Sequence, residues 1–191
     1  DDKEIYPTEE KREFHFGNLE EVMEALHRPD HFNGVAQVVT RLFDIVRPHY
    51  AFFGQKDFQQ LAIIRELVRQ TGNRVNIISN PIIREENGLA MSSRNQLLEP
   101  EIRKKAGKIY GTINRVPVMI QKYDIPYLKA WVIKSIEKTA GFCVEYFEIV
   151  DDTELRPVAS RAEMNQNSKY FGCIAVKAGK IRLIDNIEIP L

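Results

Sequence analysis

The sequence predicts an α/β protein in which a parallel strand–helix–strand unit precedes a smaller α+β domain with an antiparallel sheet. Two patterns carry this prediction. An amphipathic helical stretch lies between the short apolar runs 50–53 and 75–79, and two apolar runs near the C-terminus flank Ala178-Gly179 as in a β-hairpin. The 191 residues, 43% of them hydrophobic, are enough for one domain or two small domains.

The first half of the chain alternates helices and short strands. A short helix is expected over residues 19–25. Apolar residues then recur at helical spacing from Val35 to Val46, which predicts a helix that ends before Pro48. An apolar run typical of a buried strand follows and stops at Gly54.

A second helix follows this strand directly. Asp57 and Gln60 have the spacing of a capping box, and the apolar stripe continues to Gly72, where the helix is expected to end. The next strand, over residues 75–79, completes a parallel β-α-β unit. Such units bind ligands at the carboxyl ends of their strands, and the segment from Gly54 to Asp57 lies at one such end.

The character of the chain changes near residue 97, so we expect one domain over residues 1–97 and a second over residues 98–191. A basic amphipathic helix is predicted from Pro100 to about Arg115, before Pro117 interrupts it. The later elements are expected to be a helix over 126–139, a strand over 144–149, and hairpin strands over 170–177 and 180–185.

The composition excludes several classes of protein. Lysine and arginine number 27 against 27 acidic residues, so the formal net charge is zero and no nucleic-acid partner is expected. The apolar runs are far shorter than a membrane span, and the acidic start Asp1 to Glu4 is unlike a signal peptide, which favours a cytoplasmic protein. Cys143 and Cys173 form no metal-binding pattern and are expected to be buried.

Residues 54–57, Gly54-Gln55-Lys56-Asp57, suit a nucleotide phosphate. A glycine allows close approach of a ligand, a helix N-terminus offers free N–H groups, and Lys56 adds a mobile positive charge. The alternative is structural: Gly54 makes the turn, Asp57 caps the helix, and Lys56 is solvated. The pattern is not a Walker motif and does not by itself decide between these interpretations.

A second polar segment contains Met91, Ser92, Ser93 and Arg94. Two hydroxyls followed by a guanidinium can donate several hydrogen bonds to phosphate oxygens. The alternative is a serine-rich turn in which Ser93 or Asn95 caps a local element. His31 is a single histidine outside any recognisable catalytic motif and is interpreted as structural.

These segments, in this order and spacing, resemble the pantothenate synthetase family, the pantoate–β-alanine ligases. The resemblance covers nearly the whole chain. The matching segments are Arg28 to Val35, Val46 to Pro48, Phe52 to Leu61, Gly88 to Asn95 and Arg182 to Asn186.

The resemblance implies a nucleotidyltransferase-type Rossmann domain followed by a C-terminal lid. It also implies a reaction in which ATP and Mg²⁺ activate pantoate as pantoyl adenylate, which β-alanine then attacks to give pantothenate. No protein nucleophile is needed, because such chemistry depends on positioning and on positive charge around the phosphates. The substrates would thus be small molecules, and a homodimer is implied.

The resemblance also assigns residues. Gly54, Gln55, Lys56 and Asp57 would contact ATP, with Lys56 on phosphate and Asp57 near the ribose. Ile83, which precedes Arg84, would lie beside the nucleotide. Met91, Ser92, Ser93 and Arg94 would form the counterpart of the KMSKS loop, so that Lys56, Ser92, Ser93 and Arg94 are the expected catalytic residues. Gln60 and Arg28 would bind pantoate, and no metal-ligating residue is assigned.

One departure from the family matters. The histidine motif of the HIGH type, which carries the proposed proton donor, has no counterpart in these 191 residues. We therefore expect a truncated chain that lacks the first Rossmann strands and makes no pantothenate alone. Two rival interpretations are another adenylate-forming nucleotidyltransferase and a non-catalytic lid or interaction fragment.

Overall fold

The computed structural model describes residues 12–191, so the acidic start Asp1 to Glu4 lies outside the described residues. The chain divides into two compact units. Residues 12–54 and Gln59–Asn80 form the first, and Gln55–Phe58 with Pro81–Leu191 form the second. Each unit is described by itself below.

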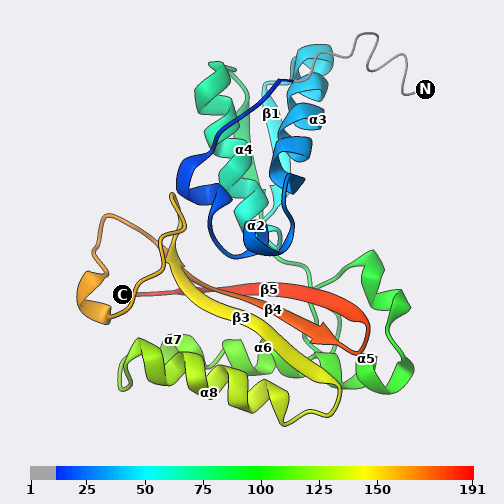
Figure 1. Cartoon of the computed structure of the whole chain (residues 1–191), viewed down its shortest axis with the longest axis vertical. Helices are drawn as coiled ribbons and strands as arrows, with labels where there is room; N and C mark the ends of the chain where they lie inside the picture. The colour runs from blue at the N-terminus through cyan, green and yellow to red at the C-terminus, as the bar shows by residue number, and fades with distance from the viewer. Residues whose placement is uncertain (1–11) are drawn as a thin grey trace. The chain divides into compact units, whose positions relative to one another are not determined.

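The first unit contains the predicted parallel β-α-β arrangement. Strand β1 (Tyr50–Gly54) pairs in parallel with β2 (Asn76–Asn80), with Tyr50 opposite Asn76. Helix α4 (Phe58–Thr71) connects them, and β1 lies between α3 (His31–Val46) and α4 in Figure 1. This confirms the predicted mixed α/β class for the first half of the chain.

Two details of the first unit differ from expectation. The helix expected over 19–25 is replaced by a 3₁₀ turn, η1 (Gly17–Glu20), and a short helix, α2 (Glu24–His27), because Met23 between them has a positive φ of 43° that no helix accommodates. Helix α3 buries Phe32, Ala36, Val39 and Phe43. It leaves Val38, Leu42 and Val46 of the expected apolar face exposed.

The second unit is built on a three-stranded antiparallel sheet. Its strands are β3 (Phe142–Asp151), β4 (Tyr170–Ala178) and β5 (Ile181–Ile189), in the order β3-β4-β5. The hairpin predicted around Ala178-Gly179 is confirmed, and Gly179 has the positive φ of 61° that such a turn needs. Strand β4 is buried along almost its whole length because it is the central strand.

Helices cover one face of this sheet. Figure 1 shows α6 (Lys108–Ile113), α7 (Val116–Met119) and α8 (Ile125–Glu137) on the same side of β3, β4 and β5. Their apolar side chains and those of the sheet form one core. Its fully buried members include Ile113, Val116, Leu128, Val132, Ile136 and Ile149.

The long basic helix expected from Pro100 to Arg115 is interrupted. Helix α5 (Pro100–Ala106) ends at Gly107, and α6 begins one residue later. A Cβ atom at Gly107 would lie 2.0 Å from the carbonyl oxygen of Asn87, so the backbone of a distant loop packs directly against this position. The expectation that the helix stops before Pro117 is confirmed, since α6 ends at Ile113 and Pro117 is the second residue of the separate helix α7.

The compact units divide between residues 80 and 81, ahead of the domain boundary expected near residue 97. Residues between these positions pack within the second unit, where Leu89 and Leu98 join its core. The assignment of residues 1–97 and 98–191 to two domains stays a prediction. The expectation that both cysteines are buried is wrong for Cys143, which is exposed, whereas Cys173 is buried.

Candidate functional site

The connector of residues 55–58 follows β1 and precedes most of α4, as the sequence predicts. Its backbone belongs to the second unit. The side-chain amide of Asn186 on β5 donates to the carbonyl oxygens of Gln55 and Lys56 at 2.9 and 3.2 Å. The ring of Phe58 packs against Phe171 of β4, with 4.3 Å between centroids. The connector is therefore held by the C-terminal sheet.

The second motif lies on a tight loop. The N–H of Met91 donates to the carbonyl of Ile83 at 2.9 Å, and Gly88 makes the reversal with a φ of 88°. The buried side chain of Asn95 donates to the Glu85 carboxylate at 2.7 Å and to the carbonyl of Ala90 at 3.0 Å. These bonds fix both ends of the loop that carries Ser92, Ser93 and Arg94.

A buried ion pair ties this loop to β5. Arg84 Nη1 and Nη2 lie 2.6 and 3.0 Å from the two oxygens of Asp185, which is a two-pronged arrangement. The guanidinium also donates to the carbonyl of Gly88 at 3.1 Å and lies 3.6 Å from the ring centre of Tyr110. Arg84 thus has a fixed position, and the loop next to it is fixed as well.

Asp185 and Asn186 are nearly inaccessible, at 5% and 2% exposure. Burial raises the pKa of the Asp185 carboxyl above its ordinary value, while Arg84, the Asn186 backbone amide and the charge of Lys56 act in the opposite direction. The charge of Lys56 therefore reaches Asp185. We call Arg84, Asp185 and Asn186 the anchor, because together they fasten both motif segments to adjacent residues of one strand.

The side chains expected to contact phosphate remain available within the second unit. Lys56 is half-buried, Ser93 and Arg94 are exposed, and none of the three side chains has a hydrogen-bond or ion-pair partner among residues 12–191. Ser92 Oγ instead accepts from the N–H of Arg94 at 3.3 Å and caps the turn η2 (Ser93–Leu97). The local capping role was expected of Ser93 or Asn95, and the structure gives it to Ser92.

The remaining residues expected to contact ATP lie at the surface or at the end of a strand. Asp57 is exposed, and no capping hydrogen bond from it is recorded in the described chain, so the capping box stays a prediction. Ile83 and Met91 are two large apolar side chains left 66% and 55% exposed. Their backbones are bonded to each other, so the loop presents two neighbouring apolar positions to solvent. Gly54 is the last residue of β1, in the first unit.

The expected pantoate residues, Gln60 and Arg28, belong to the first unit. Gln60 lies in the first turn of α4 and is half-buried, and its side chain makes no hydrogen bond within the described residues. The side-chain amide of its neighbour Gln59 already forms three hydrogen bonds. It donates to the carbonyls of Leu19 and Val22 and accepts from the N–H of Glu24. The structure thus leaves Gln60, and not Gln59, free for a ligand.

Sequence reasoning missed the anchor. Asp185 and Asn186 were noticed only as part of a matching segment, and Arg84 only as the neighbour of Ile83. A signal existed, since an acid and an amide stand side by side between the apolar pair Leu183-Ile184 and Ile187, and such groups are buried only when partnered. The partners lie 101 and about 130 residues away in sequence, so no local pattern names them.

Comparisons with known proteins decide the family. The family model described as pantoate-beta-alanine ligase matches residues 1–188. The chain belongs to this family. Pantoate–β-alanine ligase family members similar to it include the pantothenate synthetases of Bacteroides fragilis, 46% identical over 186 residues, and of Azobacteroides pseudotrichonymphae, 49% identical over 186 residues. In both cases the match covers 97% of this chain and 65% of the relative, so the chain spans just under two thirds of their length.

Solved structures of the pantoate–β-alanine ligase family agree with the fold. Pantothenate synthetase from Thermus thermophilus superimposes with a TM-score of 0.89 at 35% identity, over 100% of this chain and 68% of that chain. Pantoate-beta-alanine ligase from Francisella tularensis, complexed with beta-gamma ATP and beta-alanine, superimposes with a TM-score of 0.67 at 28% identity, over 97% of this chain and 61% of that one.

Among residues 12–191 no helix combines the length and apolar character that crossing a membrane requires. The same residues contain no group of three or more His, Cys, Asp or Glu side chains that could hold a metal ion.

Proposed function

We propose that this chain carries the ATP-phosphate contacts of a pantoate–β-alanine ligase, which joins pantoate and β-alanine to give pantothenate through a pantoyl-adenylate intermediate. Family membership supports the reaction class. The observation that carries the residue assignment is the anchor, because one pair of residues on β5 holds the Gln55-Lys56 backbone and, through Arg84, the loop of Ser92 to Arg94.

The chemistry requires positive charge and N–H donors. When a carboxylate attacks the α-phosphorus of ATP, negative groups approach one another, and fixed cations offset their repulsion. Lys56 supplies a point charge and Arg94 a planar pair of donors, and neither side chain forms a hydrogen bond or an ion pair with another described residue. Ser92 and Ser93 add hydroxyl donors.

The remaining assigned residues would surround the rest of the nucleotide. Gly54, Gln55 and Asp57 complete the turn that would face it, and Ile83 and Met91 would offer apolar surface to its base.

Mg²⁺ would neutralise phosphate charge in this reaction. The described residues offer no cluster of metal ligands, so phosphate oxygens and water would be its principal ligands.

The second substrate and the assembly are also part of the proposal. Gln60 and Arg28 would bind pantoate, and the reaction would take place in the cytoplasm. A homodimer is proposed as well. It is supported by the exposed apolar side chains of the first unit, among them Val46 on α3 and Tyr50 and Phe52 on β1, which are 59–65% exposed.

Binding of ATP to residues 1–191 tests the residue assignment. A non-hydrolysable ATP analogue should shift the amide signals of Gln55, Lys56, Ser93 and Arg94 in an NMR titration. A chain that is only a lid or interaction module would show no such shifts. That outcome would favour the non-catalytic alternative.

The reaction itself is tested by pantoate-dependent release of pyrophosphate. The absence of a histidine motif from the sequence predicts that residues 1–191 alone make no pantothenate. The assay should be run on this chain alone and after addition of the part of a relative that the chain does not match. Turnover by the chain alone would make His31 the first candidate for the role of the missing histidine. Release of pyrophosphate with other acids but not with pantoate would favour a different nucleotidyltransferase.

A further inference from the structure

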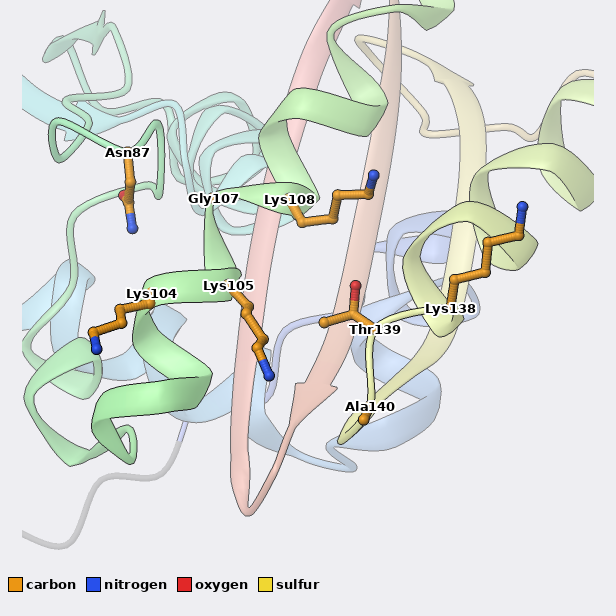
Figure 2. Close-up of a pocket in the computed structure, with 8 residues that line it drawn as sticks. All are labelled: Asn87, Lys104, Lys105, Gly107, Lys108, Lys138, Thr139 and Ala140. Atoms are coloured by element: carbon orange, nitrogen blue, oxygen red, sulfur yellow. The ribbon is translucent and has the colours of Figure 1, made fainter.

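A pocket in the second unit is lined by Asn87 and by residues of α5, α6 and the end of α8, and by none of the residues assigned to ATP. It has a volume of about 570 Å³ and is lined chiefly by Lys104, Lys105, Lys108, Lys138 and Thr139. We call it the lysine pocket. Figure 2 shows that its walls come from the end of α5, the start of α6 and the end of α8.

The charge of the lysine pocket is largely uncompensated. The residues that line it include no carboxylate. Lys104 pairs with Glu101 at 2.9 Å, and in Figure 2 it extends away from Thr139. The ammonium groups of Lys105, Lys108 and Lys138 form no ion pair or hydrogen bond with any of residues 12–191. In Figure 2 the side chains of Lys105, Lys108 and Lys138 extend in different directions from the pocket wall. An anion bound in the pocket would offset the repulsion among these like charges.

The elements that carry these lysines are firmly packed. Gly107 is buried between α5 and α6, and no side chain fits there, because the carbonyl of Asn87 occupies the place of a Cβ atom. Helix α8 is held by Val132 and Ile136, both completely buried. The lysine backbones therefore keep their positions without a ligand, which lowers the entropy cost of binding one.

Helix dipoles explain only part of this arrangement. Lys104 and Lys105 lie in the last turn of α5 and Lys138 at the C-cap of α8, where a positive charge is favourable. Lys108 is the first residue of α6, where a positive charge is unfavourable. Lys108 also lies one residue beyond the C-cap of α5, so the two helix ends act on its charge in opposite directions.

We propose that the lysine pocket is a second anion site, which binds small molecules that carry two or more linked phosphate groups. A single phosphate would leave part of the positive charge unpaired, whereas a chain of linked phosphates offers several anionic groups to the mobile lysine side chains and to the hydroxyl of Thr139. Lysine suits this ligand because it binds phosphate as a mobile point charge.

Tripolyphosphate, pyrophosphate and inorganic phosphate are the probes, each titrated into residues 1–191 and followed by amide NMR. We expect the amides of Gly107, Thr139 and Ala140 to shift, with affinity increasing from phosphate to tripolyphosphate. The triple variant Lys105→Gln, Lys108→Gln and Lys138→Gln should bind tripolyphosphate at this site about tenfold or more weakly, since three charge-assisted contacts are lost.

A charge-matched control separates a site from general attraction. Lys122→Gln, Lys134→Gln and Lys180→Gln together remove the same charge at positions outside the pocket. This control should keep the affinity within about twofold at moderate salt. Equal weakening in both triple variants, or no shift at Gly107, Thr139 and Ala140, would overturn the proposal. Lys56→Ala should leave these three shifts unchanged, so failure of the ATP assignment is distinguishable from failure of this site.

Discussion

The second unit contains two groups of positively charged side chains, and they differ in whether the protein itself neutralises their charge. In the anchor, Arg84 is largely buried and paired with a buried carboxylate. In the lysine pocket, Lys105, Lys108 and Lys138 are exposed and unpaired within the described chain. Charge is neutralised inside the protein in the first case and left for solvent or a ligand in the second.

This difference separates two ways in which a charge can serve a function. A buried pair acts through geometry, because its partners cannot move without exposing an uncompensated charge to a low dielectric. An exposed cluster acts through attraction, and its loss changes affinity and salt dependence more than stability. Lys56 and Arg94 combine geometry with attraction. Their charged groups form no hydrogen bond or ion pair with the described residues, and the segments that carry them are held by the anchor.

Removal of the anchor cation should have the largest effect. Arg84→Met leaves Asp185 buried without its partner and should destabilise the second unit by about 3–5 kcal/mol. Burial already raises the pKa of Asp185, so ionisation of this carboxyl lowers the stability of the folded state as pH rises through the folded-state pKa. The stability lost in Arg84→Met should therefore become smaller on acidification. Urea denaturation at several pH values measures both the loss of stability and its dependence on pH.

Arg103→Met is the matched control for this change. Arg103 pairs with Glu85 at 3.2 Å, but its side chain is 46% exposed. The cost should stay within about 1 kcal/mol, as for other exposed pairs. Equal losses of stability from the two arginines would show that burial of the Arg84 pair has no special importance.

Removal of a free charge beside the anchor should affect binding and spare the fold. Lys56→Ala should weaken binding of a non-hydrolysable ATP analogue by about 1.5–3 kcal/mol, the value of a charge-assisted contact. The melting temperature should change little, since Lys56 has no hydrogen-bond or ion-pair partner in the described residues. Calorimetric titration is the measurement, with Lys122→Ala as control, and unchanged affinity would refute the phosphate contact.

A change of donor geometry should have a smaller effect than loss of charge. Arg94→Lys keeps the positive charge but loses the planar fork, so the affinity for the same ATP analogue should fall by roughly 1 kcal/mol. Ser92 should still cap the turn, because it accepts from the backbone N–H of residue 94 and not from the side chain. Equal affinities of the two proteins would argue against a two-pronged contact.

Acidification should weaken the hydrogen bonds and the ion pair that Glu85 makes in the loop. The hydrogen bond from Asn95, and then Arg103, lowers the pKa of Glu85 below its ordinary value. A lowered folded-state pKa gives stability that is present above the unfolded pKa and lost as pH falls through the folded value. Carboxyl NMR should therefore show Glu85 titrating at low pH, and Asn95→Ala should raise that pKa more than Arg103→Gln does. The reverse order would contradict the dominant role of Asn95.

The sequence predicts the elements that local pattern controls. The β1-α4-β2 order, helix α8 and the C-terminal hairpin all follow from periodicity and turn residues. Local pattern could not predict the break at Gly107, because its cause is the backbone of Asn87 in a separate loop. Lys56 and Arg94 were found as isolated motifs. The residues that fasten them, Asp185 and Asn186, act over long sequence separations and became recognisable only in three dimensions.

The central claim is that the anchor fastens two phosphate-binding segments as one site. An amide NMR titration of residues 1–191 with a non-hydrolysable ATP analogue tests it most directly, in the unchanged chain and in Asn186→Leu. Leucine removes the bonds to the carbonyls of Gln55 and Lys56 while keeping similar volume. We predict that Lys56 and Arg94 shift with one dissociation constant, and that Asn186→Leu weakens both together by about 1–2 kcal/mol. Separate dissociation constants, or a loss confined to Lys56, would contradict the account.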